Sequence, residues 1–422
     1  MPNNQSPWLR IGWRNLGRNR KRTTLTALGL AVGFTACIFV VGWSDGFVVQ
    51  MVESATSLVN GQVEIHDADF RPDRGLYDTI GGRDGVDVEA WLQAIDADQA
   101  VVAAAPRVYT GGMVSSGEAT SAGLFMGIDP VRELALTRFL ENLAEGRLPT
   151  AGENELLVGV EMARQLSASL GDELVVVTSG ADGSMANDLY TLVGIFNSGL
   201  QEIDVTYVVM PIHDLQTLVV LPPGRIHEIA VATANPNLAE PTAARLFDTL
   251  PPVTAPIEVV PWTVLNPAMV EYVALASGVY FVIVLLVFGV AMFGVANSML
   301  MATYERRREF AVMLALGATP RSVWAVVLSE GLAIGVASLT LSVMLALPMT
   351  FWLANWPPDL SGLLGTDVTV LGALLTPSLQ VTFHPQSWVL SAGALLVTAL
   401  ASALYPAFRA GRVPPADTLS GI

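Results

Sequence analysis

Four long runs of apolar residues constrain this chain more than any other feature of its sequence. They cover residues 23–44, 272–304, 323–355 and 388–408, and each reaches the length of about 20 residues that an α-helix needs to cross a bilayer. Glu330, near the start of the third run, is the one charged residue within them. The chain is also 52 % apolar and only 14 % charged, unlike ordinary soluble domains. We therefore expect an α-helical membrane protein with four transmembrane helices.

The first run predicts an uncleaved anchor, because its apolar core is longer than the roughly 7–15 residues of a signal peptide. No small-x-small cleavage site follows it. An amphipathic pattern continues beyond the bilayer to about residue 60, which predicts a helical stalk. Gly29 with Gly33, and Gly331 with Gly335, permit close approach of helices.

Arginine placement predicts the orientation of the four spans. Residues 1–22 carry six basic residues and no acid, and residues 305–322 and 409–422 hold most of the other bases near the membrane. By the positive-inside rule, both termini are cytoplasmic, whereas residues 45–271 and 356–387 are extracytoplasmic. We expect residues 1–22 to form a basic amphipathic helix at the inner membrane surface.

Residues 45–271 predict a separate extracytoplasmic domain of mixed α and β structure. Alternating apolar residues indicate strands at 61–66, 174–178, 190–196, 205–210 and 226–233. Helical patterns cover 88–97, 131–143, 161–170 and 241–250, with Gly171 expected to cap the third of them. The domain has 10 Arg and 32 Asp plus Glu, a net charge of −22, which we interpret as solubility, with docking to a basic partner as the alternative. The only cysteine, Cys37, lies in the first span, so the domain folds without disulfides.

Several kinds of site are missing from the sequence. The only lysine, Lys21, is followed by Arg22 and lacks the glycine loop of the Walker A motif. The histidines show no metal-ligand spacing, and we expect each at a loop or strand edge: His66, His213, His227 and His384. We predict no catalytic residue, no metal and no nucleic-acid partner, and the nearly uncharged spans disfavour an ion relay.

Residues 304–319 form the most distinctive stretch between two spans. They read YERRREFAVMLALGAT, a charge cluster followed by an apolar stripe and the helix-ending Gly317. A short amphipathic helix between two spans, on the arginine-rich side, can bind a soluble partner and transmit the movement of that partner to the spans. The alternative interpretation is that the arginines only anchor the spans at the inner surface.

This layout resembles the permeases of the MacB, LolC/LolE and FtsX superfamily of ABC transporters. The resemblance rests on RIGWRNLGRNRKRTTLTALGLAVG near the start, VANSMLMATYERRREFAVMLALGATPRSVWAVVLSEGLAIG at 295–335 and YPAFRAGRVPPADTL at 405–419. Two stretches resemble the outer-domain core of MacB-type and lipoprotein-releasing permeases, GENELLVGVEMARQLSASLGDELVVV at 152–177 and LVGIFNSGLQEID at 192–204. GQVEIHDADF at 61–70 is closer to the lipoprotein-releasing branch.

The resemblance implies a MacB-like periplasmic core domain on a bacterial inner-membrane protein. It implies assembly with a second permease chain, identical or paralogous, and with two separate ABC ATPase subunits. ATP and Mg would belong to those ATPases, so this chain itself needs no cofactor. The family's ATPase-coupling segment maps onto Glu305, Arg306, Arg307, Arg308, Glu309, Met313, Leu314, Leu316 and Gly317.

In lipoprotein-releasing relatives, the lipid anchor enters between the first and second membrane helices. The matching positions for contact with lipid or substrate are Phe39, Trp43, Phe47, Met51, Met269, Tyr280, Phe281 and Phe288, with ordinary packing as the alternative for each. The function implied is a permease subunit that uses mechanotransmission to extract or export a lipid-linked substrate such as a lipoprotein. Two alternatives stay open, an FtsX-like transmitter that regulates a cell-wall hydrolase and a MacB-type efflux permease with a periplasmic adaptor. The apolar loop at 356–386 departs from the family pattern.

Overall fold

The computed structural model describes residues 20–82, 86–117, 119–140, 143–251, 253, 256–364, 368–370, 373–375 and 377–420. The chain divides into two compact units. The helical unit contains the residues up to 48, residues 273–362 and the residues from 378 onward; the sheet unit contains residues 49–272 and 363–377. The basic helix expected at residues 1–22 lies outside the described residues, except for its last three.

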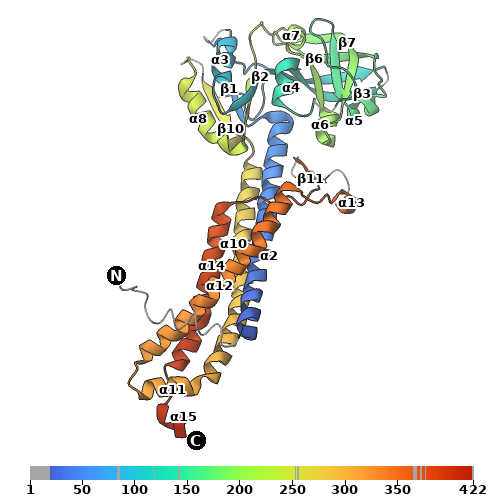
Figure 1. Ribbon diagram of the computed structural model, residues 1–422. Coiled ribbons are helices and arrows are strands. Elements are labelled where there is room, and N and C mark those ends of the chain that lie inside the picture. The colour runs from blue at the N-terminus through green and yellow to red at the C-terminus, as the bar shows by residue number, and fades with distance from the viewer. Residues whose placement is uncertain are drawn as a thin grey trace. The chain divides into compact units, whose positions relative to one another are not determined.

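The helical unit contains the four apolar helices that the sequence predicts (Figure 1). Within the described ranges, these are the helices long and apolar enough to cross a membrane: α2 (Arg20–Ala55), α10 (Pro267–Glu305), α12 (Pro320–Asn355) and α14 (Pro385–Ala410). The first continues as a π-helix, η1 (Thr56–Asn60), so the chain is helical to the residue where the amphipathic pattern ends. Two shorter helices, α11 (Arg307–Ala315) and α15 (Pro415–Ser420), complete the bundle.

Small residues bring α12 and α14 close together. A Cβ atom on Gly331 would lie 2.6 Å from the Cβ of Ala403, and one on Gly335 would lie 2.9 Å from the Cβ of Ala399. This Gly-x-x-x-Gly pair is therefore used inside the chain. By contrast, a Cβ on Gly29 of α2 would meet no atom within 4 Å.

The sheet unit is built on one large, mostly antiparallel sheet. Its strands run in the order β10-β1-β9-β2-β3-β8-β5-β7-β4, and β6 pairs with both β2 and β7. The pairs β3–β8 and β5–β7 are parallel. The bounds are β1 (Val63–Asp67), β2 (Val101–Ser116), β3 (Ala119–Ile128), β4 (Leu143–Gly146), β5 (Glu155–Gly159), β6 (Glu173–Ser179), β7 (Met185–Phe196), β8 (Tyr207–Pro211), β9 (Glu228–Thr233) and β10 (Ile257–Pro261).

Short helices join these strands, as the mixed α and β pattern predicts. They are α3 (Val88–Asp96), α4 (Pro130–Leu136), α5 (Val160–Leu166), α6 (Gln201–Thr206), α7 (Ile212–Leu218), η2 (Pro236–Leu238), α8 (Ala239–Thr249) and α9 (Trp262–Leu265). The apolar loop after α12 contains α13 (Ser361–Leu364) and a small hairpin of β11 (Val368–Val370) and β12 (Ala373–Leu375). The remainder of its middle portion lies outside the described residues.

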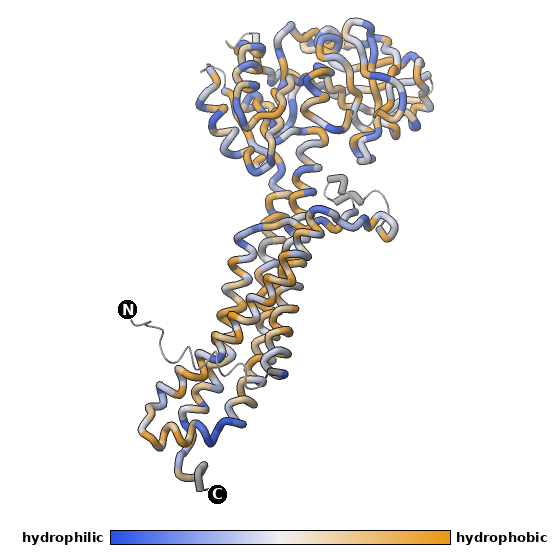
Figure 2. The backbone as a smooth tube through the Cα atoms, viewed as in Figure 1, coloured by the Kyte–Doolittle hydropathy of each residue, from blue (hydrophilic) through white to orange (hydrophobic). Residues whose placement is uncertain are grey.

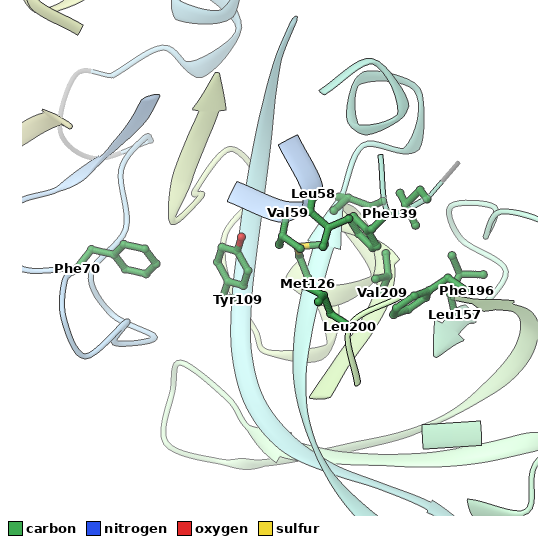
Figure 3. Close-up of a cluster of buried hydrophobic side chains, with 12 residues drawn as sticks. Leu58, Val59, Phe70, Tyr109, Met126, Phe139, Leu157, Phe196, Leu200 and Val209 are labelled. Atoms are coloured by element: carbon green, nitrogen blue, oxygen red, sulfur yellow. The ribbon is translucent and has the colours of Figure 1, made fainter. Parts of the chain in front are cut away.

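One apolar cluster ties the end of the first helix to the sheet (Figure 3). Leu58 and Val59 of η1 are buried together with Met126 of β3 and Phe196 of β7. The rings of Phe139 and Phe196 meet edge to face, with centroids 5.5 Å apart. The π-helical end of α2 is thus part of the core of the sheet unit.

Two helix predictions in this unit are wrong in their extent. The helix expected over 131–143 ends at Leu136, because Thr137 adopts an extended conformation (φ −128°, ψ 153°), and Leu143 begins a strand. The helix expected to end at Gly171 ends at Leu166. Ser167 takes the left-handed conformation there (φ 50°), and Gly171 (φ 90°) instead belongs to the turn before β6.

Two of the four histidines lie at strand ends, as expected, and both are buried. His66 lies in β1, which has neighbours on both sides, and His227 accepts a hydrogen bond at Nδ1 from the backbone N of Tyr109, at 3.0 Å. Burial lowers the pKa of His227 to about 4, so the ring stays neutral. His227 therefore serves as a neutral polar group in the core.

A buried ion cluster lies beside this histidine. The Arg107 guanidinium donates to Glu133 of α4 at 3.1 and 2.6 Å and to Glu228 of β9 at 3.1 Å. The Tyr109 hydroxyl donates to the same Glu228 carboxylate at 2.8 Å. These contacts fasten α4 to the sheet through fully buried charges, which are costly unless paired in this way.

Candidate functional site

The segment between α10 and α12 forms a corner at one end of the helical unit (Figure 1). Arg306 leaves the helical conformation (φ −100°, ψ 12°), so α10 ends at Glu305 and α11 begins at Arg307. Figure 2 shows a strongly hydrophilic stretch at the start of this corner, followed by apolar residues, at the end of an apolar bundle. The chain turns again at Gly317, whose φ of +96° favours glycine, and the Thr319 side chain then caps α12.

Arg306 fastens this corner from the inside. Its Nε atom donates to Glu309 Oε2 at 2.9 Å, and its Nη1 atom donates to Glu330 of α12. The guanidinium carbon lies 5.2 Å from the centroid of the Phe310 ring. Burial alone would lower the pKa of Arg306, but the carboxylates of Glu330 and Glu309 raise it above its ordinary value. Arg306 therefore stays charged, and it pairs with carboxylates of its own chain instead of being available to a partner protein.

The apolar stripe of α11 is divided between the core and the surface. Phe310 is fully buried in a cluster that includes Val323 and Val327 of α12, and Met313 and Leu314 pack against that cluster. In this structure, therefore, these two predicted coupling residues support the corner itself.

Other residues predicted to couple to the ATPase are exposed on the side of α11 that faces away from the bundle, here called its outer face. Arg308, Val312 and Leu316 follow one another at intervals of four and are exposed, so they lie along one side of the helix. Leu316 is 84 % exposed, an unusual position for a leucine at the end of a helix. Glu305, Arg307 and Gly317 are exposed nearby, and Glu309 is half-buried. The result is a firmly held helix with a basic and apolar outer face.

The residues predicted to contact lipid or substrate occupy different surroundings. Phe281 of α10 is 66 % exposed, whereas Phe288 is only 4 % exposed and lies in a cluster with Phe34. The Tyr280 hydroxyl donates to the backbone oxygen of Ser387 at 3.2 Å. Trp43 is exposed, and the others are half-buried or buried: Phe39, Phe47, Met51 and Met269. The structure thus leaves Phe281 and Trp43 on the surface and uses Phe288 in packing.

Sequence reasoning missed the role of Glu330 at this corner. A lone acid near the start of an apolar span is itself a signal, because such a charge is costly without a partner. The bases beside α11 were the available partners, although the sequence did not single out Arg306 among them. In the parts of the chain that the structure describes, no group of three or more His, Cys, Asp or Glu side chains is placed to hold a metal ion.

Comparisons with known proteins agree on the class of the chain. The sequence model of the MacB-like periplasmic core domain matches residues 23–248, and that of the FtsX-like permease C-terminal region matches residues 281–415. The lipoprotein-releasing system transmembrane protein LolC of Neisseria meningitidis serogroup B is 24 % identical, over 97 % of this chain and 98 % of its own length. The macrolide export ATP-binding/permease protein MacB of Marinobacter nauticus is 24 % identical, over 98 % of this chain and 60 % of its own length.

Among solved structures, the periplasmic region of MacB from Actinobacillus actinomycetemcomitans is similar to part of the chain. It is 12 % identical, with a TM-score of 0.37 over 53 % of this chain and 97 % of that one. The match to the core-domain model covers more than half of the 422 residues, and the second model covers most of the remainder. The chain therefore belongs to the superfamily of ABC transporter permeases that includes MacB, LolC/LolE and FtsX.

Proposed function

We propose that this chain is the permease subunit of a LolC/LolE-type ABC transporter and that it transmits the work of a separate ATPase to its outer domain. A second permease chain would complete the membrane part. The substrate would be lipid-linked, such as a lipoprotein, extracted at the outer face of a bacterial inner membrane. The similarity to LolC over nearly the full length of both chains supports this class of substrate.

The observation that carries the proposal is the construction of α11. The Arg306 contacts with Glu309 and Glu330, together with buried Phe310, fix the helix to the bundle. A force applied to the outer face of α11 would therefore move α10 and α12 together with α11, because α11 is not a flexible loop. The exposed Leu316 supplies the apolar anchor, and Arg308 supplies a charge for acidic groups of the ATPase.

The test is a pair of matched substitutions in the chain co-expressed with its ATPase. Leu316→Glu on α11 should lower permease-dependent ATP hydrolysis by about tenfold or more, because burying an unpaired carboxylate in the interface costs more than the roughly 1.4 kcal/mol that corresponds to a tenfold change. The control is Leu189→Glu on β7, a leucine that is also at least half exposed; it should leave hydrolysis unchanged. Full ATPase copurification and full activity with Leu316→Glu would rule out α11 as the coupling surface.

A further inference from the structure

A hollow with a basic lining lies behind the corner, where α10, α11 and α14 end or begin. It has a volume of about 610 Å³. Three arginines line it, Arg307, Arg409 and Arg412, and the described residues of its lining include no acid. Within the described residues, none of the three is in an ion pair. The hollow therefore presents positive charge that the described part of the chain does not neutralise.

Aromatic rings hold two of these arginines in place. The guanidinium carbon of Arg412 lies 3.9 Å from the centroid of the Phe408 ring, and that of Arg409 lies 5.4 Å from the centroid of Tyr304. Stacking of this kind leaves the N–H groups at the edge of the guanidinium free to donate. Planar, pre-oriented guanidinium groups are well suited to bind a phosphate.

An apolar groove shares a wall with the hollow. It has a volume of about 340 Å³ and is lined by Trp324 and Leu328 of α12 and by Leu404, Tyr405, Ala407 and Phe408 of α14. Tyr405 and Phe408 line both spaces. The centroids of the Phe408 and Trp324 rings are 5.8 Å apart, so Phe408 contacts both an arginine of the hollow and a ring that lines the groove.

We propose that the hollow and the groove together bind one anionic phospholipid of the surrounding bilayer. The headgroup phosphate would lie among Arg307, Arg409 and Arg412, and an acyl chain would lie along Trp324 and Leu328. The two spaces meet at the end of apolar helices, the level at which lipid headgroups, aromatic rings and arginines gather. A carboxylate from a partner protein would match the charge but leaves the adjoining groove unused, so the pair of spaces favours an amphiphile.

This lipid differs from the transported substrate of the proposed function in place and in role. Its site adjoins the first residue of α11 and the last turn of α14. A lipid bound there would contact α11 through Arg307, separately from the contact of Arg306 with Glu330. The proposal does not depend on the identity of the substrate.

The test uses the full chain purified with its associated subunits and native mass spectrometry of bound lipid. Wild type should retain phosphatidylglycerol in preference to phosphatidylcholine. The double variant Arg409→Gln/Arg412→Gln should lose about tenfold or more of that preference, since each base near a lipid surface contributes about 1 kcal/mol. The matched control Lys21→Gln/Arg321→Gln removes two exposed basic residues outside both the hollow and the outer face of α11 and should keep the preference.

Additional variants and competition experiments distinguish a bound phospholipid from a bound phosphate or a partner protein. Arg409→Lys/Arg412→Lys keeps the charge without the planar fork and should retain part of the preference, which shows that loss in the Gln variant is not caused by unfolding. Soluble glycerophosphoglycerol and inorganic phosphate should not displace the lipid, because neither fills the groove. Displacement by either would overturn the proposal in favour of a phosphate site. Unchanged lipid preference in the Gln variant would also overturn it, and loss of the ATPase instead of the lipid would assign the hollow to the partner subunit.

Discussion

Glu64 is a buried acidic residue of the sheet unit, and its side chain is only partly satisfied by hydrogen bonds. It lies in β1, pairs with Arg71, and its Oε1 atom accepts no hydrogen bond from the described residues. Burial, with a further contribution from the Glu228 carboxylate, raises the pKa of Glu64 to about 7. Glu228 behaves differently: despite its burial, Arg107 and neighbouring arginines hold its pKa below the ordinary value. One carboxyl of the pair is thus protonated far more readily than the other.

We expect the stability of the sheet unit to depend on the protonation of Glu64. Because the folded-state pKa is raised, the stabilising contribution of this group is complete below about pH 4.5 and is lost as the pH rises through about 7. In Glu64→Gln the amide imitates the protonated carboxyl. The difference in unfolding free energy between wild type and Glu64→Gln should therefore shift against wild type by on the order of 2 kcal/mol between pH 4.5 and 8.

The comparison with Glu64→Gln is needed because the contribution of His227 to the free energy of unfolding changes with pH in the opposite direction. Its lowered pKa means that its contribution is lost as the pH falls from 6.5 towards 4. This contribution is present in both proteins and cancels in the difference. Hydrogen exchange of the β1 and β9 amides in the full chain, corrected for the intrinsic pH dependence of exchange, measures the two free energies. A difference that does not vary with pH would show that Glu64 has an ordinary pKa.

At the scale of elements, the spacing of apolar residues predicted the helices and strands whose sequences have a strong apolar pattern. The four apolar helices and the strands β6, β7 and β9 follow directly from the sequence pattern. The long hairpin of β2 and β3 did not, because alanine, glycine and serine dominate it and have little strand preference of their own. Its strands form because pairing with β9, β6 and β8 buries them, and such long-range pairing is invisible in a local pattern.

The candidate site shows the same division between local pattern and tertiary contact. The charge cluster, the helix and its end at Gly317 were predictable from residue types. Which residues of the corner are buried and which are exposed could not be predicted, because this depends on where Phe310 and Glu330 lie in three dimensions. Arg306 and Arg308 have the same chemistry, yet one is a tertiary contact and the other is exposed.

The two Gly-x-x-x-Gly pairs provide a prediction about helix packing. Gly331→Ala should destabilise the helical unit by about 1–3 kcal/mol, because its Cβ would lie 2.6 Å from that of Ala403 and α12 and α14 must separate. Gly29→Ala, the matched change in α2, places its Cβ in open space and should leave the stability of the isolated chain unchanged. Thermal unfolding in detergent, followed by helical circular dichroism, checks both. Equal melting temperatures for the two variants would contradict the close contact of α12 with α14.

At the scale of the whole molecule, two continuous helices, α2 and α10, each belong to both compact units. Both α2 and α10 begin in one unit and end in the other. The far end of α2 is held by Leu58 and Val59 in the core of the sheet unit, and the near end of α10 meets the corner at Arg306. Along the chain, the two units are therefore joined by helical residues. The proposed mechanotransmission needs no flexible linker on this path.

The proposed route of a lipid-linked substrate can be tested along α10. A photo-crosslinking amino acid at Phe281, which is 66 % exposed, should capture a lipidated peptide in membranes, and ATP should lower the yield as the substrate is released. Phe293 is 73 % exposed but lies twelve residues, about 18 Å, further toward the corner. The same probe there should capture bilayer lipid or a second permease chain, and not the lipidated peptide.

A probe at Phe288 provides the internal control, since that side chain is only 4 % exposed and packs with Phe34. It should give cross-links within the chain. The comparison separates exposure from position: Phe281 and Phe293 are similarly exposed, so a difference between them reflects where the substrate binds along the helix. Equal capture of the lipidated peptide at both positions would mean nonspecific contact through the bilayer. No capture at Phe281 in either nucleotide state would remove α10 from the substrate path and favour a permease whose outer domain acts without extracting lipid.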